Sequence, residues 1–108
     1  FGSGDGDLGY ALKKKFPQLD LSCTEGDDQC EKILKDRGYK NYKNLDEINK
    51  KFDLIVTTHS LEHLPDINSI FSKFKEMLNP NGLIFFEVPN CSDEYWNGRP
   101  YDGPHLLF

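Results

Sequence analysis

The sequence predicts an α/β fold, a doubly wound and mostly parallel sheet with helices on both faces. Two observations support this prediction. Segments with the 3.6-residue apolar period of helices alternate along the chain with short apolar or alternating segments typical of strands. Successive strands are also separated by a helical segment, and such a unit pairs its strands in parallel through a right-handed crossover.

The first two elements follow a cluster of glycines. Residues 8–16 carry apolar side chains at helical spacing, and Pro17 ends the run, which predicts a short helix. Residues 19–24 alternate apolar and polar side chains, so we expect a half-buried strand there.

A second helix and an edge strand come next. Asp27 and Asp28 can cap the helix and place negative charge in its first turn, and Gly38 supplies its end. Residues 39–42 suit a short edge strand, and the polar residues 43–51 form a connection.

The second half of the chain repeats this order. Consecutive apolar and β-branched residues at 52–58 predict a central strand that is covered on both faces. Asp66 can cap a helix over residues 67–78, and residues 79–82 form a turn. A second buried strand over residues 83–88 follows, and a long loop is expected after it.

Composition excludes several classes of function. The 108 residues carry 13 Lys and Arg against 18 Asp and Glu, and this acidic balance disfavours nucleic acid and anionic membranes as partners. No apolar stretch is long enough to span a bilayer. Cys23, Cys30 and Cys91 form no disulfide framework, so we expect a cytoplasmic location. The histidines and cysteines show no metal-ligand spacing, and no metal is expected.

Glycines crowd the segment before and inside the first helix. Gly2, Gly4, Gly6 and Gly9 allow tight turns and let a ligand approach main-chain N–H groups. In a doubly wound sheet such a loop lies at the carboxyl end of a strand, where cofactors bind. Two spacings coexist: the dinucleotide pattern from Gly4 to Gly9, and a tighter one from Gly2 to Gly6. An ordinary strand-to-helix turn is the alternative interpretation.

A carboxylate stands at the expected distance from this loop. Glu25 follows the strand predicted at 19–24 and lies 19 residues after Gly6, where an acidic side chain can accept hydrogen bonds from ribose hydroxyls. A solvated carboxylate at a strand end is the alternative. Asp5 and Asp7 repel a pyrophosphate but tolerate a positively charged or zwitterionic ligand, which favours another cofactor over NAD(P).

Several motifs occur in a specific order over nearly the whole chain. They are F-G-S-G-D-G at residues 1–6, Glu25, F-D-L-I-V at 52–56, L-E-H-L-P-D at 61–66 and L-N-P-N-G-L-I at 78–84. In this combination the sequence resembles the class I S-adenosylmethionine-dependent methyltransferases. It resembles more narrowly their small-molecule branch, through V-P-N at 88–90 and H-L-x-F at 105–108.

The resemblance implies a Rossmann-like fold and transfer of a methyl group from S-adenosylmethionine to O, N or C of a small-molecule acceptor. By this resemblance, Gly2, Gly4 and Gly6 would line the methionine and ribose side of the cofactor. Glu25 would hold the ribose hydroxyls. An NAD(P)-binding oxidoreductase domain is the alternative, and a degenerate α/β domain retained as an interaction module is a third interpretation.

The resemblance also implies roles for residues nearer the acceptor. Asn44 and Leu45 would touch the adenine, and His59 and Ser60 would lie beside the methionine moiety and the transferred methyl group. A general base is needed only if the acceptor must lose a proton, and imidazole is suited to that task. We expect His59 and His105 as catalytic residues.

Other polar residues receive a structural interpretation. His63 is a further possible base, with Glu62 as its orienting partner, but we expect both residues to shape the turn before the next helix. The family's glycine loop follows a central first strand, and two further strands come later, so the resemblance implies an incomplete domain. We expect residues 1–89 to be its core and residues 90–108 a loop on the substrate side.

Overall fold

The computed structural model describes residues 1–90 and has the predicted alternation of helices and strands. Its elements are α1 (Asp7–Lys15), β1 (Ser22–Thr24), α2 (Asp28–Asp36), β2 (Lys40–Tyr42), the 3-10 helix η1 (Leu45–Glu47), β3 (Phe52–Thr58), the 3-10 helix η2 (Leu61–His63), α3 (Ile67–Met77) and β4 (Leu78–Glu87). The α/β class is therefore confirmed. No helix in residues 1–90 is long and apolar enough to cross a membrane.

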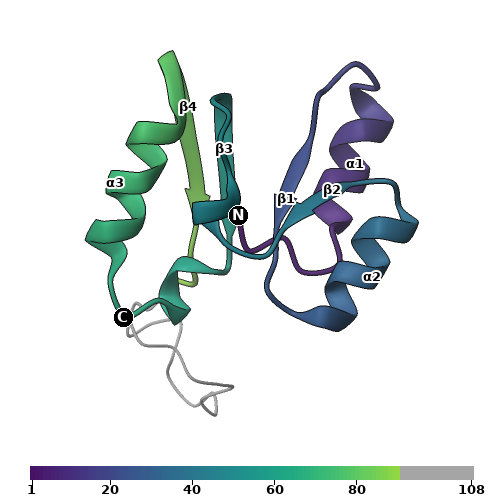
Figure 1. Ribbon diagram of the computed structural model, residues 1–108, viewed down its shortest axis with the longest axis horizontal. Coiled ribbons are helices and arrows are strands. Elements are labelled where there is room, and N and C mark those ends of the chain that lie inside the picture. Colours follow the sequence, from purple (N-terminus) through teal and green to yellow (C-terminus); the bar gives the residue numbers. More distant parts are fainter. Residues whose placement is uncertain (91–108) are drawn as a thin grey trace.

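The strands form two parallel pairs. β1 pairs with β2, and β3 pairs with β4, in the parallel direction that the crossover helices require. Within residues 1–90 the two pairs are separate two-stranded sheets. In Figure 1, α1 and α2 flank the β1–β2 pair on one side of the molecule, and α3 flanks the β3–β4 pair on the other.

Local capping explains where the helices begin. The Asp27 carboxylate accepts hydrogen bonds from the N–H groups of Gln29 and Cys30, and it starts α2. These backbone hydrogen bonds, that of Cys30 first and that of Gln29 second, hold the pKa of Asp27 below its ordinary value. Asp66 starts α3 in the same way by accepting from the N–H of Ser69.

The main core lies between α3 and the β3–β4 pair. Leu45, Ile55, Leu61 and Phe74 are its buried members, and the Phe74 side chain has no solvent exposure. The ring of Phe1 packs edge-on against that of Phe74, with centroids 5.3 Å apart. Complete burial of such a side chain contributes about 1.5–3 kcal/mol, so this cluster stabilises the second half of the chain.

The expectation that residues 52–58 are covered on both faces is wrong. Ile55 and Thr57 are buried on the side of α3, but Leu54 is 51% exposed. On β4, Leu83 is 67% and Phe85 is 53% exposed. Since successive strand side chains point to opposite faces, one face of this pair meets α3 and the other lies open within the described residues.

Two strand boundaries also differ from expectation. Residues 19–21 do not join β1, because its partner β2 offers only three residues for pairing. β4 begins at Leu78, the last residue of the expected helix, and includes the expected turn at 79–82; Leu78 pairs with Phe52 before the register shifts. The turn survives as an irregularity within the strand, with Asn81 in the left-handed region at φ 65°.

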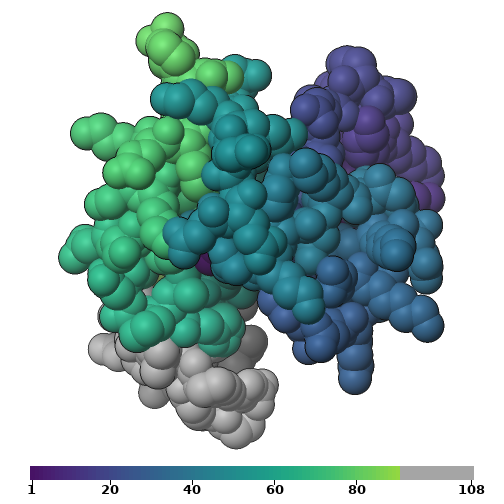
Figure 2. Space-filling view, viewed as in Figure 1, coloured from purple at the N-terminus to yellow at the C-terminus, as the bar shows by residue number. Residues whose placement is uncertain are grey.

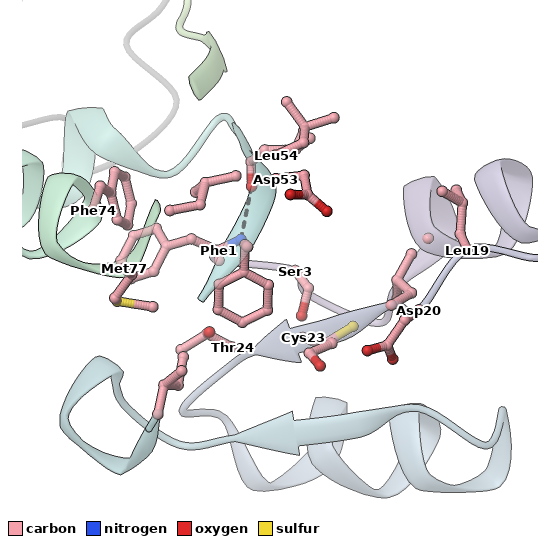
Figure 3. A pocket seen from close by; sticks show the side chains of 18 of the residues that line it. Phe1, Ser3, Leu19, Asp20, Cys23, Thr24, Asp53, Leu54, Phe74 and Met77 are labelled. Atoms are coloured by element: carbon pink, nitrogen blue, oxygen red, sulfur yellow. Dashed lines mark hydrogen bonds between the residues drawn. The ribbon is translucent and has the colours of Figure 1, made fainter. Parts of the chain in front are cut away.

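A groove of about 350 Å³ separates the two strand pairs and is lined by residues of β1 and β3 (Figure 3). The first residues of the chain lie in it. The nitrogen of Phe1 donates to the carbonyl of Val56 at 2.7 Å, and the N–H groups of Gly2 and Ser3 donate to the carbonyl of Thr24. The N-terminus therefore ties β1 to β3 (Figure 1), and the flanking elements cover it almost entirely in Figure 2.

Candidate functional site

Glu25 and the glycine loop are in direct contact. One carboxylate oxygen of Glu25 accepts a hydrogen bond from the N–H of Gly4 at 2.9 Å, and the other accepts from the N–H of Asp27 at 3.0 Å. The N–H of Glu25 itself donates to the carbonyl of Tyr42 at 3.0 Å, which anchors the residue at the end of β1. A carboxylate has about four acceptor positions, so hydroxyl groups of a ligand can still bind to it.

A pocket of about 500 Å³ opens beside this contact. The glycine loop, the segment after β2, the segment after β3 and α3 all contribute to its wall. Of the residues expected to bind the cofactor, this wall includes Gly2, Gly4, Glu25, Asn44, Leu45 and Ser60. Pockets of this size are typical of small-molecule sites.

The three predicted glycines have different surroundings. A Cβ at Gly4 would meet no atom within 4 Å, so there is space beside this residue, whose N–H is bound to Glu25. A Cβ at Gly2 would lie 2.1 Å from the Oγ of Ser60, which itself donates to the carbonyl of Gly2. Gly6 is not in the pocket wall: it precedes α1 at φ 84°, and a Cβ there would lie 2.5 Å from Leu34. Close packing explains the glycine at this position.

Polar contacts hold the segment after β2 in place. The Asn44 side chain accepts from the N–H of Asp46 and donates to the carboxylate of Glu47 at 2.8 Å, which fixes the start of η1. Leu45 is buried, with 8% exposure, beneath this turn. Lys73 from α3 pairs with Asp46 at 2.5 Å, and both residues line the pocket. The sequence interpretation identified Asn44 and Leu45 but missed Lys73 and Asp46.

His59 lies beside the pocket rather than in its wall. It follows β3 with φ 51°, a left-handed conformation that is unfavourable for a residue with a Cβ. Its N–H donates to the carbonyl of Glu87 at 2.9 Å, and its Nε2 lies 2.9 Å from the Oε1 of that residue. The expected neighbour Ser60 does line the pocket, while the other expected catalytic residue, His105, lies outside the described residues.

His63 takes the position in the pocket wall that His59 does not. Its Nε2 lies 3.8 Å from the Oε1 of Glu62, a carboxylate that is only 3% exposed. The sequence interpretation had given both residues a structural role in the turn, and they do form most of η2. The signal that could have identified His63 is its place four residues after His59, one turn beyond the end of the strand.

Other reactive groups do not form a site in residues 1–90. No cluster of three or more His, Cys, Asp or Glu able to hold a metal ion is present in that range. Cys23 is buried beside the glycine loop, and desolvation raises the pKa of its thiol. A raised thiol pKa reduces the thiolate fraction, which makes Cys23 unsuited to nucleophilic catalysis.

Comparison with known proteins gives consistent matches. Residues 1–105 match the methyltransferase domain family. A ubiquinone biosynthesis O-methyltransferase from Pasteurella multocida (strain Pm70) is 45% identical over 47 residues, which are 44% of this chain and 19% of that protein. The protein of the same name from Histophilus somni (strain 2336) is 40% identical over 47 residues, 44% of this chain and 20% of that protein. A trans-aconitate 2-methyltransferase from Deinococcus radiodurans is 28% identical over 99 residues, 85% of this chain and 37% of that protein. The matched segments thus span well under half the length of each relative.

Proposed function

This chain belongs to the methyltransferase domain family, and we propose that it forms the cofactor-binding part of an enzyme that methylates a small molecule with S-adenosylmethionine. The contact between Glu25 and the N–H of Gly4 is the observation that carries the proposal. In this contact an anchored carboxylate lies at one end of a pocket of suitable size, beside a glycine whose Cβ position is empty.

The residues in the pocket fit the parts of this cofactor. Glu25 retains acceptor positions for the two ribose hydroxyls, and the empty Cβ position of Gly4 leaves room for the ligand beside them. The apolar side chain of Leu45 and the amide of Asn44 suit the adenine. The glycine main chain at Gly2 suits the methionine side.

When bound, the cofactor supplies an electrophilic methyl group on a positively charged sulfur. The chain's own residues then have to orient the acceptor and exclude water, which can supply most of the acceleration of such a displacement. His59 remains our proposal for a group near the transferred methyl, because it stands where β3 ends next to Ser60. His105 remains a proposal from the sequence alone.

An oxidoreductase that binds NAD(P) is not supported. The family is one of methyltransferases, and the dinucleotide pattern requires Gly6 and Gly9, which are engaged in packing against Leu34 and Leu21. A relative named as an O-methyltransferase favours oxygen as the accepting atom. The acidic charge supports a small molecule over nucleic acid as partner, and the scattered cysteines support a cytoplasmic location. The division into a core at 1–89 and a substrate-side loop at 90–108 also stays a proposal.

Calorimetric titration of the full-length protein with S-adenosylhomocysteine tests the proposal. We expect saturable binding and about 100-fold weaker binding for Glu25→Ala, since hydrogen bonds to a charged group contribute about 1.5–3 kcal/mol each. Asp20→Ala is the matched control, because the Asp20 carboxylate is exposed and does not line the pocket. A folded full-length protein that binds NADH but not S-adenosylhomocysteine would contradict the proposal.

A further inference from the structure

Residues 43–47, which follow β2 and which we call the bridging segment, are tied to two helices. The Nζ of Lys43 donates to the Oδ1 of Asp28 on α2 at 2.6 Å. Near the other end of the segment, the Nζ of Lys73 on α3 donates to the Oδ1 of Asp46 at 2.5 Å. Lys43, Asp46 and Lys73 all line the pocket of about 500 Å³. The bridging segment therefore forms a wall of this pocket that is attached to both halves of the molecule.

Hydrogen bonds within the bridging segment fix its shape. The two oxygens of the Glu47 carboxylate accept from the N–H of Lys43 at 3.0 Å and from the amide nitrogen of Asn44 at 2.8 Å. The amide oxygen of Asn44 accepts from the N–H of Asp46 at 3.0 Å. Leu45, between them, is 8% exposed and belongs to the main core. The segment is thus preorganised, which lowers the cost of binding a ligand.

The bridging segment offers oxygen acceptors to a ligand in the pocket. Asn44 and Asp46 line the pocket. The amide oxygen of Asn44 uses one of its two acceptor positions for the N–H of Asp46, and Lys73 binds one oxygen of the Asp46 carboxylate. The remaining acceptor positions suit a group that donates N–H, such as the exocyclic amino group of adenine. They disfavour an oxygen at the same place, because an oxygen has no proton to donate.

We propose that Lys73 and Glu47 are positioning residues for the adenine base of the cofactor. The inference rests on the proposed function. Glu47 does not line the pocket and acts through Asn44, whose amide it holds from within the segment. Lys73 acts through Asp46, whose carboxylate it holds from α3. The acceptor oxygens of Asn44 and Asp46 thereby keep fixed places beside the amino group of the base.

Loss of the contact between Lys73 and Asp46 should affect binding more than folding. The two side chains are 38% and 77% exposed, and exposed ion pairs contribute little to stability. A carboxylate that is no longer held must be ordered each time the base binds, and ordering one such side chain weakens binding by about 2- to 10-fold. Lys73→Met removes the charge and keeps a side chain of similar length.

Discrimination between two bases measures this positioning. Calorimetric titration of the full-length protein is carried out with S-adenosylhomocysteine and with S-inosylhomocysteine, in which an oxygen replaces the amino group. The wild type should prefer the adenosyl compound by about 10-fold or more, since the inosyl compound leaves acceptors unpaired. Lys73→Met should reduce this preference by about threefold or more, and Lys73→Arg, which keeps the charge, should restore it.

A matched ion pair elsewhere provides the control. Lys50 pairs with Asp20 at 3.2 Å and is exposed to a similar extent, but neither residue lines this pocket. Lys50→Met should therefore leave the preference for the adenosyl compound unchanged.

A double variant separates positioning from direct contact with the base. If Lys73 acts through Asp46, Lys73→Met should not reduce the preference further in a protein that already carries Asp46→Asn. Additive losses would mean that Lys73 meets the base itself. A preference that rises in Lys73→Met would mean the same, because a donor facing the oxygen of the inosyl compound would have been removed. Either result overturns the proposal.

Glu47→Ala tests the second positioning residue and covers the case in which Lys73→Met does not fold. It removes both hydrogen bonds to the carboxylate, so the preference should fall, while Glu47→Gln can still accept one of them and should be less affected. Equal weakening of both ligands indicates a purely structural role and overturns the proposal. If the wild type does not bind S-adenosylhomocysteine, the proposed function is contradicted. Binding without a base preference, or with one that no variant changes, contradicts the positioning role alone.

Discussion

The two strand pairs are built differently. The β1–β2 pair with α1 and α2 buries only a few side chains, among them Leu34, and α1 contains no buried residue; its ion pairs, such as Arg37 with Asp7, lie on the surface. The β3–β4 pair with α3 carries the continuous apolar core. Exposed ion pairs contribute little to stability. The difference teaches that the stability of the first pair depends on a few buried side chains, whereas that of the second rests on the main core between α3 and its strands.

Truncating the largest fully buried side chain of each region should lower the free energy of unfolding more than any other change considered. Phe74 and Leu34 are both fully buried, but Phe74 joins the main core while Leu34 packs under the glycine loop and Tyr39. We expect Phe74→Ala to lower the free energy of unfolding by about 3–5 kcal/mol and Leu34→Ala by about 2–5 kcal/mol. Urea unfolding measures both values, and hydrogen exchange shows which strands lose protection.

The position of the strands that lose protection against hydrogen exchange distinguishes the two regions more sharply than the free energy of unfolding does. In Leu34→Ala, exchange should accelerate mainly in α2 and β2, with β3 and β4 protected as before. Equal acceleration in both strand pairs would mean that the two regions unfold as one cooperative unit.

Substituting alanine for glycines of the glycine loop should destabilise the fold by an intermediate amount. Gly2 and Gly4 both have positive φ, 63° and 51°, so alanine costs about 1–2 kcal/mol at either position from backbone strain. Gly2→Ala should cost more, because the new Cβ would overlap the Oγ of Ser60 where the two regions meet. Gly26→Ala is the control, since its nearest contact is the carbonyl of Lys43 at an ordinary 3.6 Å.

Thermal unfolding gives the ranking of these variants. The expected order of destabilisation is Gly2→Ala, then Gly4→Ala, then Gly26→Ala. If Gly4→Ala proves as costly as Gly2→Ala, the contact with Ser60 does not join the two regions.

Local patterns in the sequence were sufficient to predict most of the elements. The apolar period placed α1 and α3, and the alternation at 19–24 placed Glu25 at the end of a strand, where the structure has it; its contact with the N–H of Gly4 was not predicted. Both features depend on neighbouring residues or on the geometry of one strand–helix unit. Parallel pairing followed from the same alternation of strands and helices.

Features that depend on distant packing were not predictable in this way. The apolar run at 52–58 does not reveal that Leu54 is left exposed, because that depends on what covers the sheet. The choice between His59 and His63 at the pocket depends on the backbone conformation of one residue, His59, which turns its side chain toward Glu87. No periodicity encodes such a conformation.

The smallest expected effect concerns the cap of α2 and appears only at acidic pH. Hydrogen bonds from the N–H groups of Cys30 and Gln29 hold the pKa of Asp27 below its ordinary value, so the folded state binds its proton less readily than the unfolded state. The stabilisation is complete above the unfolded value of about 4 and is lost as pH falls through the lower folded value. Asp27→Asn keeps an oxygen that can accept the same hydrogen bonds but removes the charge. Its melting temperature should therefore fall less steeply below about pH 4 than that of the wild type, with Asp20→Asn as the exposed control.

Hydrogen exchange tests the same effect region by region. In the wild-type protein, acidification should reduce the protection of α2 before that of α3, and in Asp27→Asn this difference should shrink. An unchanged pH profile would show that the charge of the cap does not contribute to the stability of the first region.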